Sequence, residues 1–529
     1  MRRTDLHSGV PAHAPLILAI DFGTQSVRAV LFDAGGATVA RRQVAIRPYD
    51  APRPGWAEHE PAYRWGALVE ACRGLWREPG ADAARVAAVA LATQRNTVLC
   101  LDGDGAPLRP AIVWLDQRRT PELAPLAPHW RLALAATGMR HTIARLRAQA
   151  KSNWLRRNEP ELWAATAHYV FLSGWLTHRL TGRIADSVGA QVGHVPFDYR
   201  RQRWAGARDW RWQALGLDRA RMPALVPVGE RIGAITTDAC AATGIPAGVP
   251  LVAAASDKAC EMLGAGALSP HVAALSYGTS ATVNVTHRAW VEPFPFLPAY
   301  PAALPGAYAA EVQVARGFWM VRWFRDEFGH PERERARALG VEPESLFDDL
   351  ARDVPPGAMG LLLQPSWSPG VRVPGPEAKG AVIGFGDVHT RAHLYRAILE
   401  GLAYGLREGL ERLERRGGTP VSELRVAGGG SRSDVAMQLT ADVFARPAER
   451  ARCADAAALG AAIVAAAGTG LHADVAAAAR AMVRPGERFL PDPDASRTYD
   501  RLYRDVYLAL YGRLRPLYDR IRRITGYPP

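Results

Sequence analysis

The sequence repeats one short pattern about half a chain apart. Residues 19–30 read AIDFGTQSVRAV and residues 274–285 read ALSYGTSATVNV: an apolar strand, an aromatic residue, a Gly-Thr turn and a second strand that ends in valine. Two extended runs joined by such a turn form a tight hairpin. The repeat therefore predicts two similar halves, although short hairpins can also resemble one another by chance.

Strand and helix signals alternate within each half. Residues 86–94 (VAAVALATQ) and 98–105 (VLCLDGDG) read as strands in the first half, while residues 424–444 (LRVAGGGSRSDVAMQLTADVF) read as strand, loop and helix in the second. This alternation predicts α/β layers. We expect a loose tail over residues 1–14, a first domain over 15–267 and a second over 268–529, with the boundary in the GAGALSP segment.

The last part of the chain carries apolar side chains at steps of three and four residues, which predicts an amphipathic helix packed on the body of the protein. These side chains are Tyr499, Leu502, Tyr503, Val506, Leu510, Leu514 and Leu517.

Composition restricts the class of protein. A chain of 529 residues with 48% hydrophobic content can bury the cores of two large domains. No run approaches the roughly 20 apolar residues of a membrane span, and the opening residues lack the apolar segment of a signal peptide. The cysteines show no CxxC spacing, which argues against a disulfide framework or zinc site and favours the cytoplasm. They are Cys72, Cys100, Cys240, Cys260 and Cys453.

The net charge of +13 raises the question of nucleic-acid binding. The positive residues are spread evenly and are almost all arginine, with lysine only at Lys151, Lys258 and Lys379, so no basic cluster stands out. We expect neither nucleic acid nor membrane as a partner. A small anionic ligand such as a nucleotide would suit this surface, and a homodimer remains an open option.

Asp21 ends the first apolar run, directly before the Gly-Thr turn. Such a turn lets backbone amides and hydroxyls approach a phosphate closely. A carboxylate beside it would repel phosphate unless a divalent cation lay between them, so Asp21 is a candidate Mg²⁺ ligand, acting through water. The alternative is an ordinary turn in which the aspartate caps local amides. Ser276 takes this position in the second copy.

Asp257 follows a strand of small apolar residues and begins a helix. Acids at the carboxyl ends of strands in α/β folds lie where ligand clefts form. In phosphoryl transfer the acceptor hydroxyl needs a positioned base, and Asp257 is our candidate. Its alternative role is to cap the helix. The glycines of residues 428–430 form a weaker signal for a nucleotide, because neither GxGxxG nor a P-loop motif occurs.

Taken together, these stretches resemble the FGGY family of carbohydrate kinases over nearly the whole chain. Beyond the DFGT motif, the resemblance rests on GWAEHEP (55–61), TQRNT (93–97), AIVWLDQRR (111–119), LTGRIAD (180–186), GIPAGVPLVAAASDKA (244–259), YGTSA (277–281), GAVIGFGDVHTRAHLYRAILEG (380–401) and AGGGSRSD followed by ADAAALGAA. It implies an α/β fold of two actin-like, RNase H-like ATPase domains that close over a central cleft, with ATP held chiefly by the second domain and the sugar or polyol by the first.

The resemblance also assigns roles to individual residues. It makes Asp257 the general base and Asp21 the metal-associated carboxylate. The acceptor side comprises Gln94, Arg95, Asn96 and Trp114, together with Asp257 and Lys258. The ATP side comprises Gly23, Thr24, Gln25, Ser26 and Arg28 in the first phosphate loop, Gly278 and Thr279 in the second, and Gly429 and Ser433 near the adenosine. Arg322 is placed on the same side, but it and the bulky Phe318 depart from the smaller or amide residues that some family members carry near the nucleotide.

The residues around the expected base depart from the family pattern. The family often reads Gly-Asp-Gln, whereas Ser256 and Lys258 flank Asp257 here. A lysine beside the base would attract an anionic acceptor or lower the pKa of Asp257, which adds sugar acids to the candidate substrates. The alternative is that Lys258 points into solvent.

The sequence therefore predicts an ATP- and Mg²⁺-dependent kinase that phosphorylates a hydroxyl of a sugar, polyol or sugar acid. One alternative is a non-catalytic regulatory protein that binds nucleotide and sugar, although such a protein need not keep both Asp21 and Asp257. A second is an ATPase of the actin or chaperone type, which the acceptor-side segments TQRNT and AIVWLDQRR disfavour.

Overall fold

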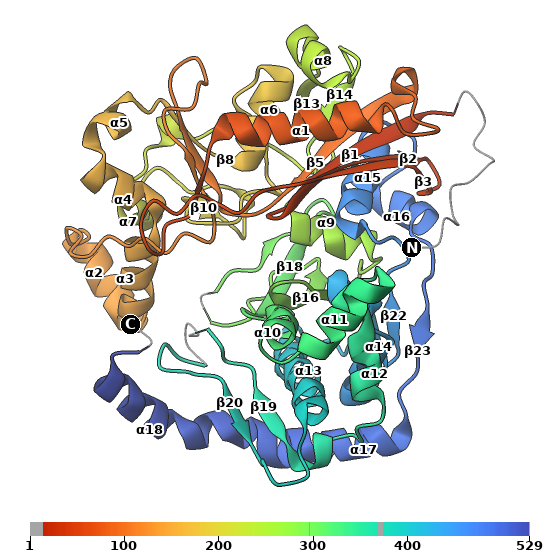
Figure 1. The fold of residues 1–529 in the computed structure, drawn as a ribbon. Coiled ribbons are helices and arrows are strands. Elements are labelled where there is room, and N and C mark those ends of the chain that lie inside the picture. Colours follow the sequence, from red (N-terminus) through yellow and green to blue (C-terminus); the bar gives the residue numbers. More distant parts are fainter. Residues whose placement is uncertain (1–13, 296, 369–373, 528–529) are drawn as a thin grey trace.

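A computed structural model describes residues 14–295, 297–368 and 374–527 (Figure 1). The predicted N-terminal tail lies outside this range except for Ala14, whose carbonyl accepts a hydrogen bond from Arg85 Nε at 2.9 Å. Within the described ranges, no helix is long and apolar enough to cross a membrane.

The first half is built on a six-stranded sheet of order β13-β14-β5-β1-β2-β3. Strands β1, β2 and β3 form an antiparallel meander, β5 runs parallel to β1, β14 runs parallel to β5, and β13 is antiparallel to β14. Their bounds are β1 Leu16–Phe22, β2 Ser26–Asp33, β3 Thr38–Ala45, β5 Val86–Thr93, β13 Arg231–Ala234 and β14 Pro250–Val252.

The second half repeats this arrangement in a seven-stranded sheet of order β17-β18-β16-β15-β21-β22-β23. Strands β15, β16 and β18 form the meander, β21 and β22 follow in parallel, and β23 is antiparallel to β22. The two halves thus share one topology, as the repeated hairpin predicts. The bounds are β15 Val272–Tyr277, β16 Ala281–His287, β17 Tyr300–Pro301, β18 Tyr308–Val314, β21 Glu423–Ala427, β22 Ala448–Arg450 and β23 Arg488–Phe489.

Smaller elements complete the two halves. The short strands are β4 Glu58–His59, β6 Val98–Leu101, β7 Ala111–Ile112, β8 His168–Phe171, β9 Ala185–Ser187, β10 Phe197–Asp198, β11 Arg203–Trp204, β12 Ala224–Val226, β19 Leu362–Gln364 and β20 Ala381–Ile383. The helices of the first half are α1 Pro61–Leu75, α2 Pro128–Ala136, α3 Arg140–Gln149, α4 Lys151–Asn158, α5 Pro160–Ala165, α6 Leu172–Thr181, α7 Trp210–Leu215, α8 Thr237–Thr243 and α9 Asp257–Gly264. Those of the second are α10 Trp319–Glu327, α11 His330–Leu339, α12 Phe347–Arg352, α13 Arg391–Gly417, α14 Asp434–Phe444, α15 Ala456–Gly468, α16 Val475–Met482, α17 Pro493–Arg501 and α18 Leu508–Thr525.

Strand β1 is buried on both faces, which explains its unbroken apolar run. Side chains alternate between the faces of a strand. Leu16 and Leu18 accordingly join the core shared with α1 and α6, whereas Ile17 and Ala19 join the core shared with α9 and α15. By the same alternation Asp21 belongs to the face that carries α9 and α15.

Helices α9 and α15 follow equivalent strands of the two halves and cross between the sheets (Figure 1). They touch backbone to backbone. A methyl group on Gly264 would collide with the carbonyl of Ala456, and one on Gly460 would collide with the carbonyl of Cys260. Helix α15 also packs on β1 and β5, so a helix late in the sequence covers the sheet of the first half.

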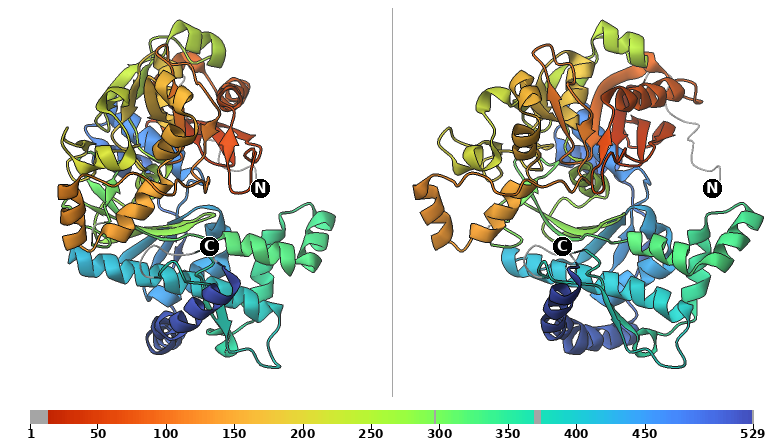
Figure 2. Two further views of the ribbon diagram at one scale, coloured as in Figure 1. Left: turned by 90° about the vertical axis from the view of Figure 1, so that its left-hand side faces the viewer. Right: turned by 60° about the vertical axis from the view of Figure 1, so that its left-hand side comes forward.

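Helix α13 spans the core of the second half, and the C-terminal helices pack beside it as the lower edge of the molecule (Figure 2). Tyr499 and Tyr503 are fully buried, in agreement with the amphipathic pattern. A π-helical segment, Leu502–Tyr507, joins α17 to α18. The prediction is wrong for Leu517, which is 49% exposed on the distal part of α18.

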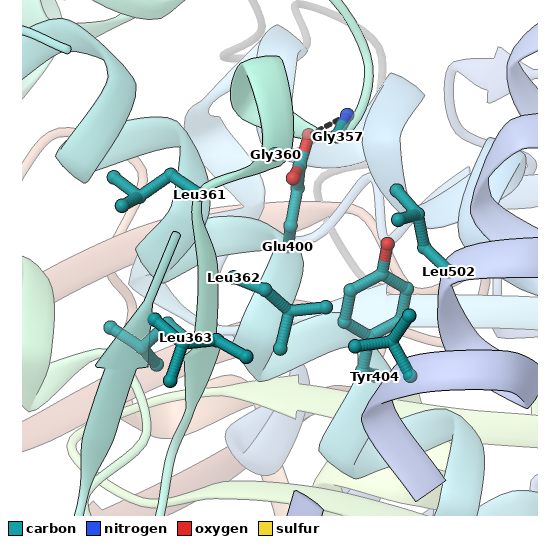
Figure 3. A pocket seen from close by; sticks show the side chains of 10 residues that line it. Gly357, Gly360, Leu361, Leu362, Leu363, Glu400, Tyr404 and Leu502 are labelled. Carbon is teal, nitrogen blue, oxygen red and sulfur yellow. Dashed lines mark hydrogen bonds between the residues drawn. The ribbon is translucent and has the colours of Figure 1, made fainter. Parts of the chain in front are cut away.

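A cavity of about 100 Å³ lies in the second half (Figure 3). Glu400 faces it, and its Oε1 accepts hydrogen bonds from Gly357 N, Arg396 Nε and Tyr499 Oη. Its lining includes none of the residues predicted to bind ATP or an acceptor, so it is separate from the candidate site. The lining residues are Gly357, Gly360, Leu361, Leu362, Leu363, Ile383, Glu400, Tyr404, Leu502 and Val506.

Candidate active site

Asp21 lies at the end of β1, opposite Arg28 in the register of the first hairpin. The two side chains form an ion pair with Arg28 Nη1 2.8 Å from Asp21 Oδ2. Burial raises the pKa of Asp21 to about 6; the charge of Arg28 opposes the rise, and those of Asp257 and Asp455 add to it. The acids at 21 and 257 therefore lie close enough to repel one another, although 236 positions separate them in the sequence.

The turn of the first hairpin is tied to the acceptor segments. Thr24 Oγ1 donates to Gln94 Oε1 (3.1 Å) and accepts a hydrogen bond from Trp114 Nε1 (2.9 Å). Gly23 N donates to Ser26 O (3.0 Å) and closes the turn, while the Gln25 carbonyl accepts from Ile46 N. Two predicted acceptor residues and the predicted phosphate loop thus form one hydrogen-bonded unit.

Asp257 begins α9, where its Oδ1 accepts a hydrogen bond from the backbone amide of Lys258 at 2.8 Å. Burial raises the pKa of Asp257, and the charges of Lys258 and Arg95 partly offset the rise. A carboxylate whose pKa is raised towards neutrality is a better proton acceptor than a solvated one, which suits the role of a base.

Arg95 lies beside Asp257 and joins the two halves. Its Nη1 donates to both carboxylate oxygens of Glu311 on β18, at 3.0 and 2.9 Å, and its Nε donates to Ser256 Oγ at 3.2 Å. The guanidinium also lies 5.1 Å from the centre of the Tyr300 ring. Two donor nitrogens, Arg95 Nη2 and Gln94 Nε2, are buried and have no hydrogen-bond partner among the described residues.

Asn96 and Trp114, both predicted to lie on the acceptor side, make different contacts. Asn96 adopts a left-handed backbone conformation (φ 54°), and its Oδ1 accepts a hydrogen bond from His194 N at 3.3 Å. The segment that carries Trp114 is fixed by buried charges. Asp116 binds Arg118 and Lys151, with Lys151 Nζ 3.3 Å from Asp116 Oδ1.

Lys258 extends towards the second hairpin. Its Nζ lies 2.8 Å from Glu261 Oε2 and 2.5 Å from Ser276 Oγ. A β-carbon added at Gly278 would lie 3.8 Å from this nitrogen. The side chain is 25% exposed, so Lys258 does not simply reach into solvent. Burial disfavours its ammonium form, but the charges of Glu261 and Asp257 outweigh that effect and raise its pKa.

Each hairpin is linked to the crossing helix of the other half. The first hairpin reaches α15 through Arg28 Nε, 3.5 Å from Asp455 Oδ1, and Arg41 on β3 also binds Asp455. The second hairpin reaches α9 through Lys258 and Ser276. Asp455 is the residue before α15, and Asp257 is the first residue of α9, so the two acids occupy nearly equivalent places.

The predicted nucleotide side combines the second hairpin with the glycine loop. Phe318 stacks on Tyr277 with ring centres 4.5 Å apart, and its backbone amide donates to Gly278 O at 3.0 Å. A β-carbon at Gly430 would collide with the Phe318 ring, whereas one at Gly429 would meet open space. Thr279 lies in the same turn, and its carbonyl accepts a hydrogen bond from Trp319 N.

The other two residues predicted to bind ATP differ in their surroundings: Ser433 is hydrogen-bonded within the protein, and Arg322 is exposed. Ser433 caps α14 by accepting from Ala436 N, and its hydroxyl donates to Asp348 Oδ1 at 2.5 Å. Its single O–H donor is therefore used within the protein. Arg322 is exposed on α10, one turn beyond Phe318.

The sequence reasoning missed several side chains of this region. The spacing of Lys258 and Glu261 on a predicted helix was a usable signal for an ion pair, because residues three apart share a helix face. Asp455 precedes an Ala-rich helix, but nothing local indicates that its partners are Arg28 and Arg41. Glu311 carries no sequence signal, since its partner Arg95 lies in the other half.

Comparison with known proteins gives the family. Residues 16–264 match the N-terminal domain and residues 273–469 the C-terminal domain of the FGGY family of carbohydrate kinases. The chain is 32% identical over 498 residues to the uncharacterized sugar kinase YgcE of Escherichia coli K12, covering 93% of this chain and 92% of that protein. It is 27% identical over 492 residues to the xylulose kinase of Lactococcus lactis, covering 92% and 95% of the two chains.

Solved structures agree with this assignment. The crystal structure of xylulose kinase from Rhodospirillum rubrum superposes with a TM-score of 0.80 and 28% identity, covering 95% of this chain and all of the other. The gluconate kinase of Lactobacillus acidophilus, at 21% identity and a TM-score of 0.77, shares the fold. The predicted fold class, two actin-like α/β domains, is confirmed. The chain belongs to the FGGY family of carbohydrate kinases, which makes it an ATP-dependent phosphotransferase with an alcohol group as acceptor.

Proposed function

We propose that this kinase transfers the γ-phosphoryl group of MgATP to a hydroxyl of a sugar, polyol or sugar acid, with Asp257 as the general base. The observation that carries the proposal is the pair of buried acids, Asp21 and Asp257, which come from distant segments and lie close enough for the charge of Asp257 to raise the pKa of Asp21. Separate acids serve separate roles in phosphoryl transfer: one accompanies the metal and the other accepts the proton of the acceptor.

The residues around Asp21 fit a magnesium ion. Asp21 is 3% exposed, and Asp257 and Asp455 place further negative charge near it. Within the described ranges no group of three or more acidic, histidine or cysteine side chains could hold a metal by itself. That agrees with the usual binding of Mg²⁺ through one or two carboxylates, water and substrate phosphates. When bound, the ion would neutralise charge on the phosphates.

In the reaction, the carboxylate of Asp257 accepts the proton of the acceptor hydroxyl. The acceptor oxygen then forms its bond to the γ-phosphorus while the bond from that phosphorus to the bridging oxygen breaks, and ADP leaves with the electron pair. Arg95 and Gln94 orient the acceptor through their unpaired donors, and Thr24 fixes Gln94 and Trp114 against the phosphate loop.

A coupled assay of ADP release tests the function. The purified kinase is given MgATP and a panel of polyols, ketoses and aldonates, and we expect release to depend on one class of acceptor. Release at an equal rate without any acceptor would instead indicate an ATPase. An absence of release with every member, together with tight binding of ATP and a sugar, would favour a regulatory protein.

A further inference from the structure

Lys258 combines three properties that its neighbours do not share. It follows the expected base directly in the sequence, it carries a full positive charge, and its side chain leaves the acceptor side for the second hairpin. The described structure gives it no hydrogen bond to Gln94, Arg95, Asn96 or Trp114; its Nζ binds Glu261 and Ser276.

The ammonium group lies beside the bare turn of the second hairpin. Gly278 has no side chain, and a β-carbon there would lie within 3.8 Å of Lys258 Nζ. A phosphate bound to the backbone amides of this turn would therefore lie next to the ammonium group of Lys258. Lysine carries three N–H donors, and Glu261 and Ser276 account for two of them. Their hydrogen bonds fix the nitrogen in place, so little side-chain freedom remains to be lost on binding.

The first hairpin differs from the second in the residue near the end of its first strand. In the first hairpin the residue near the strand end is Asp21, which is paired with Arg28 and which the proposed function places beside a metal ion. In the second hairpin the equivalent residue is Ser276, which is neutral, and Lys258 supplies a cation from the helix of the other half. A lysine can bind phosphate directly as a point charge.

We infer that Lys258 binds the β- and γ-phosphates of the nucleotide at the second hairpin, and does not bind the acceptor. This inference rests on the proposed function, because it assumes that the nucleotide's phosphates lie between the two hairpins. It adds a specificity-determining residue for nucleoside polyphosphates at the position where the family often has glutamine.

Binding measurements on full-length variants test the inference without a known acceptor. Affinities of AMP, MgADP and MgATP are measured by calorimetry for the wild type and for Lys258→Gln. We expect the variant to bind MgADP and MgATP about tenfold to one-hundredfold more weakly, the range for a hydrogen bond to a charged group. AMP should bind as it does to the wild type, because it lacks the outer phosphates.

Glu261→Gln serves as the matched control. If Lys258 only anchors α9 to β15, both substitutions break the same ion pair and should weaken all three nucleotides alike. If Lys258 binds phosphate, removal of the competing carboxylate should leave MgATP binding unchanged or tighter. The double variant Lys258→Gln/Glu261→Gln has no unpaired charge and should still lose MgATP affinity, which separates the effect from misfolding.

Two results would overturn the inference: equal weakening of AMP and MgATP in Lys258→Gln, or an unchanged MgATP affinity in that variant. Failure of the proposed function would look different. The wild type would then bind MgATP but phosphorylate no acceptor, and the comparison of AMP with MgATP would still decide the role of Lys258.

Discussion

The two hairpins have the same backbone arrangement but differ in the charged groups beside their turns. At the end of β1 stands Asp21, bound to Arg28 of its own hairpin; at the end of β15 stands Ser276, bound to Lys258 from the helix of the other half. Equivalent positions of the two halves thus carry side chains of different chemistry. On the proposed function, the first hairpin takes a cation-bridged phosphate and the second a phosphate bound by protein donors, so we expect the two turns to have different roles.

The acids at the starts of the crossing helices offer the strongest test of this asymmetry. Asp257→Asn should lower kcat by about 10²–10⁴-fold, the range for loss of a general base. Asp455→Asn changes the nearly equivalent residue and should have a much smaller effect, because its carboxylate binds Arg28 and Arg41. Steady-state rates of ADP release decide the matter, and similar losses in the two variants would remove Asp257 from its role.

The ion pair between Arg95 and Glu311 should be the costliest link between the halves to break. Both side chains are largely buried, at 16% and 9% exposure, so Glu311→Gln leaves a buried guanidinium without its counter-charge. We expect a loss of about 3–5 kcal/mol in the free energy of unfolding. Glu78→Gln, which breaks an exposed pair with Arg42, should cost about 0–1 kcal/mol. Urea unfolding of both variants gives the difference; equal losses would contradict it.

Asp21 should make the free energy of unfolding depend on pH, whereas its counterpart Ser276 does not titrate. Burial raises the pKa of Asp21 in the folded protein to about 6, above its ordinary value of 3.8, so the folded protein binds the proton more tightly than the unfolded chain. Stability is therefore highest below the unfolded pKa and falls as the pH rises through the window from 3.8 to 6. A shift of about two units corresponds to roughly 3 kcal/mol.

Comparison with Asp21→Asn isolates this contribution. Denaturant unfolding at pH 4.5 and pH 7.5, without nucleotide or metal, should show that the wild type loses more stability than the variant between the two conditions. Parallel curves would mean that Arg28 fully compensates the burial of the carboxylate.

The crossing of α9 and α15 should cost less to disturb than the ion pair of Arg95 with Glu311. Gly460→Ala forces a methyl group against the carbonyl of Cys260 and should destabilise the protein by about 1–3 kcal/mol. Gly512→Ala is the control, since nothing lies within 4 Å of the added carbon on α18; there we expect a gain of about 0.5–1 kcal/mol. Thermal unfolding measures both, and a stabilised Gly460→Ala would show that the helices can move apart freely.

The sequence predicted those features that follow from local pattern. The hairpins, the α/β layers and the placement of Asp21 and Asp257 at strand and helix ends are all local consequences of apolar runs that stop at a turn. The links between Arg28 and Asp455, and between Arg95 and Glu311, could not be predicted, because each joins side chains from different halves. The exposure of Leu517 was missed for a related reason: periodicity predicts an apolar face but not where its packing partner ends. The boundary near residue 268 stays a prediction.

The placement of α15 beneath the first sheet has a consequence for biosynthesis. Ile17, Ala19 and Val30 share a core with Leu459, Ile463 and Val464, so residues from the two ends of the chain complete one layer. Until α15 has been synthesised, only α9 can cover that side of the nascent N-terminal sheet, so part of its apolar surface stays exposed. Chaperone demand should therefore be greatest before Gly468 leaves the exit tunnel, and a gene cut at the midpoint should yield an insoluble product.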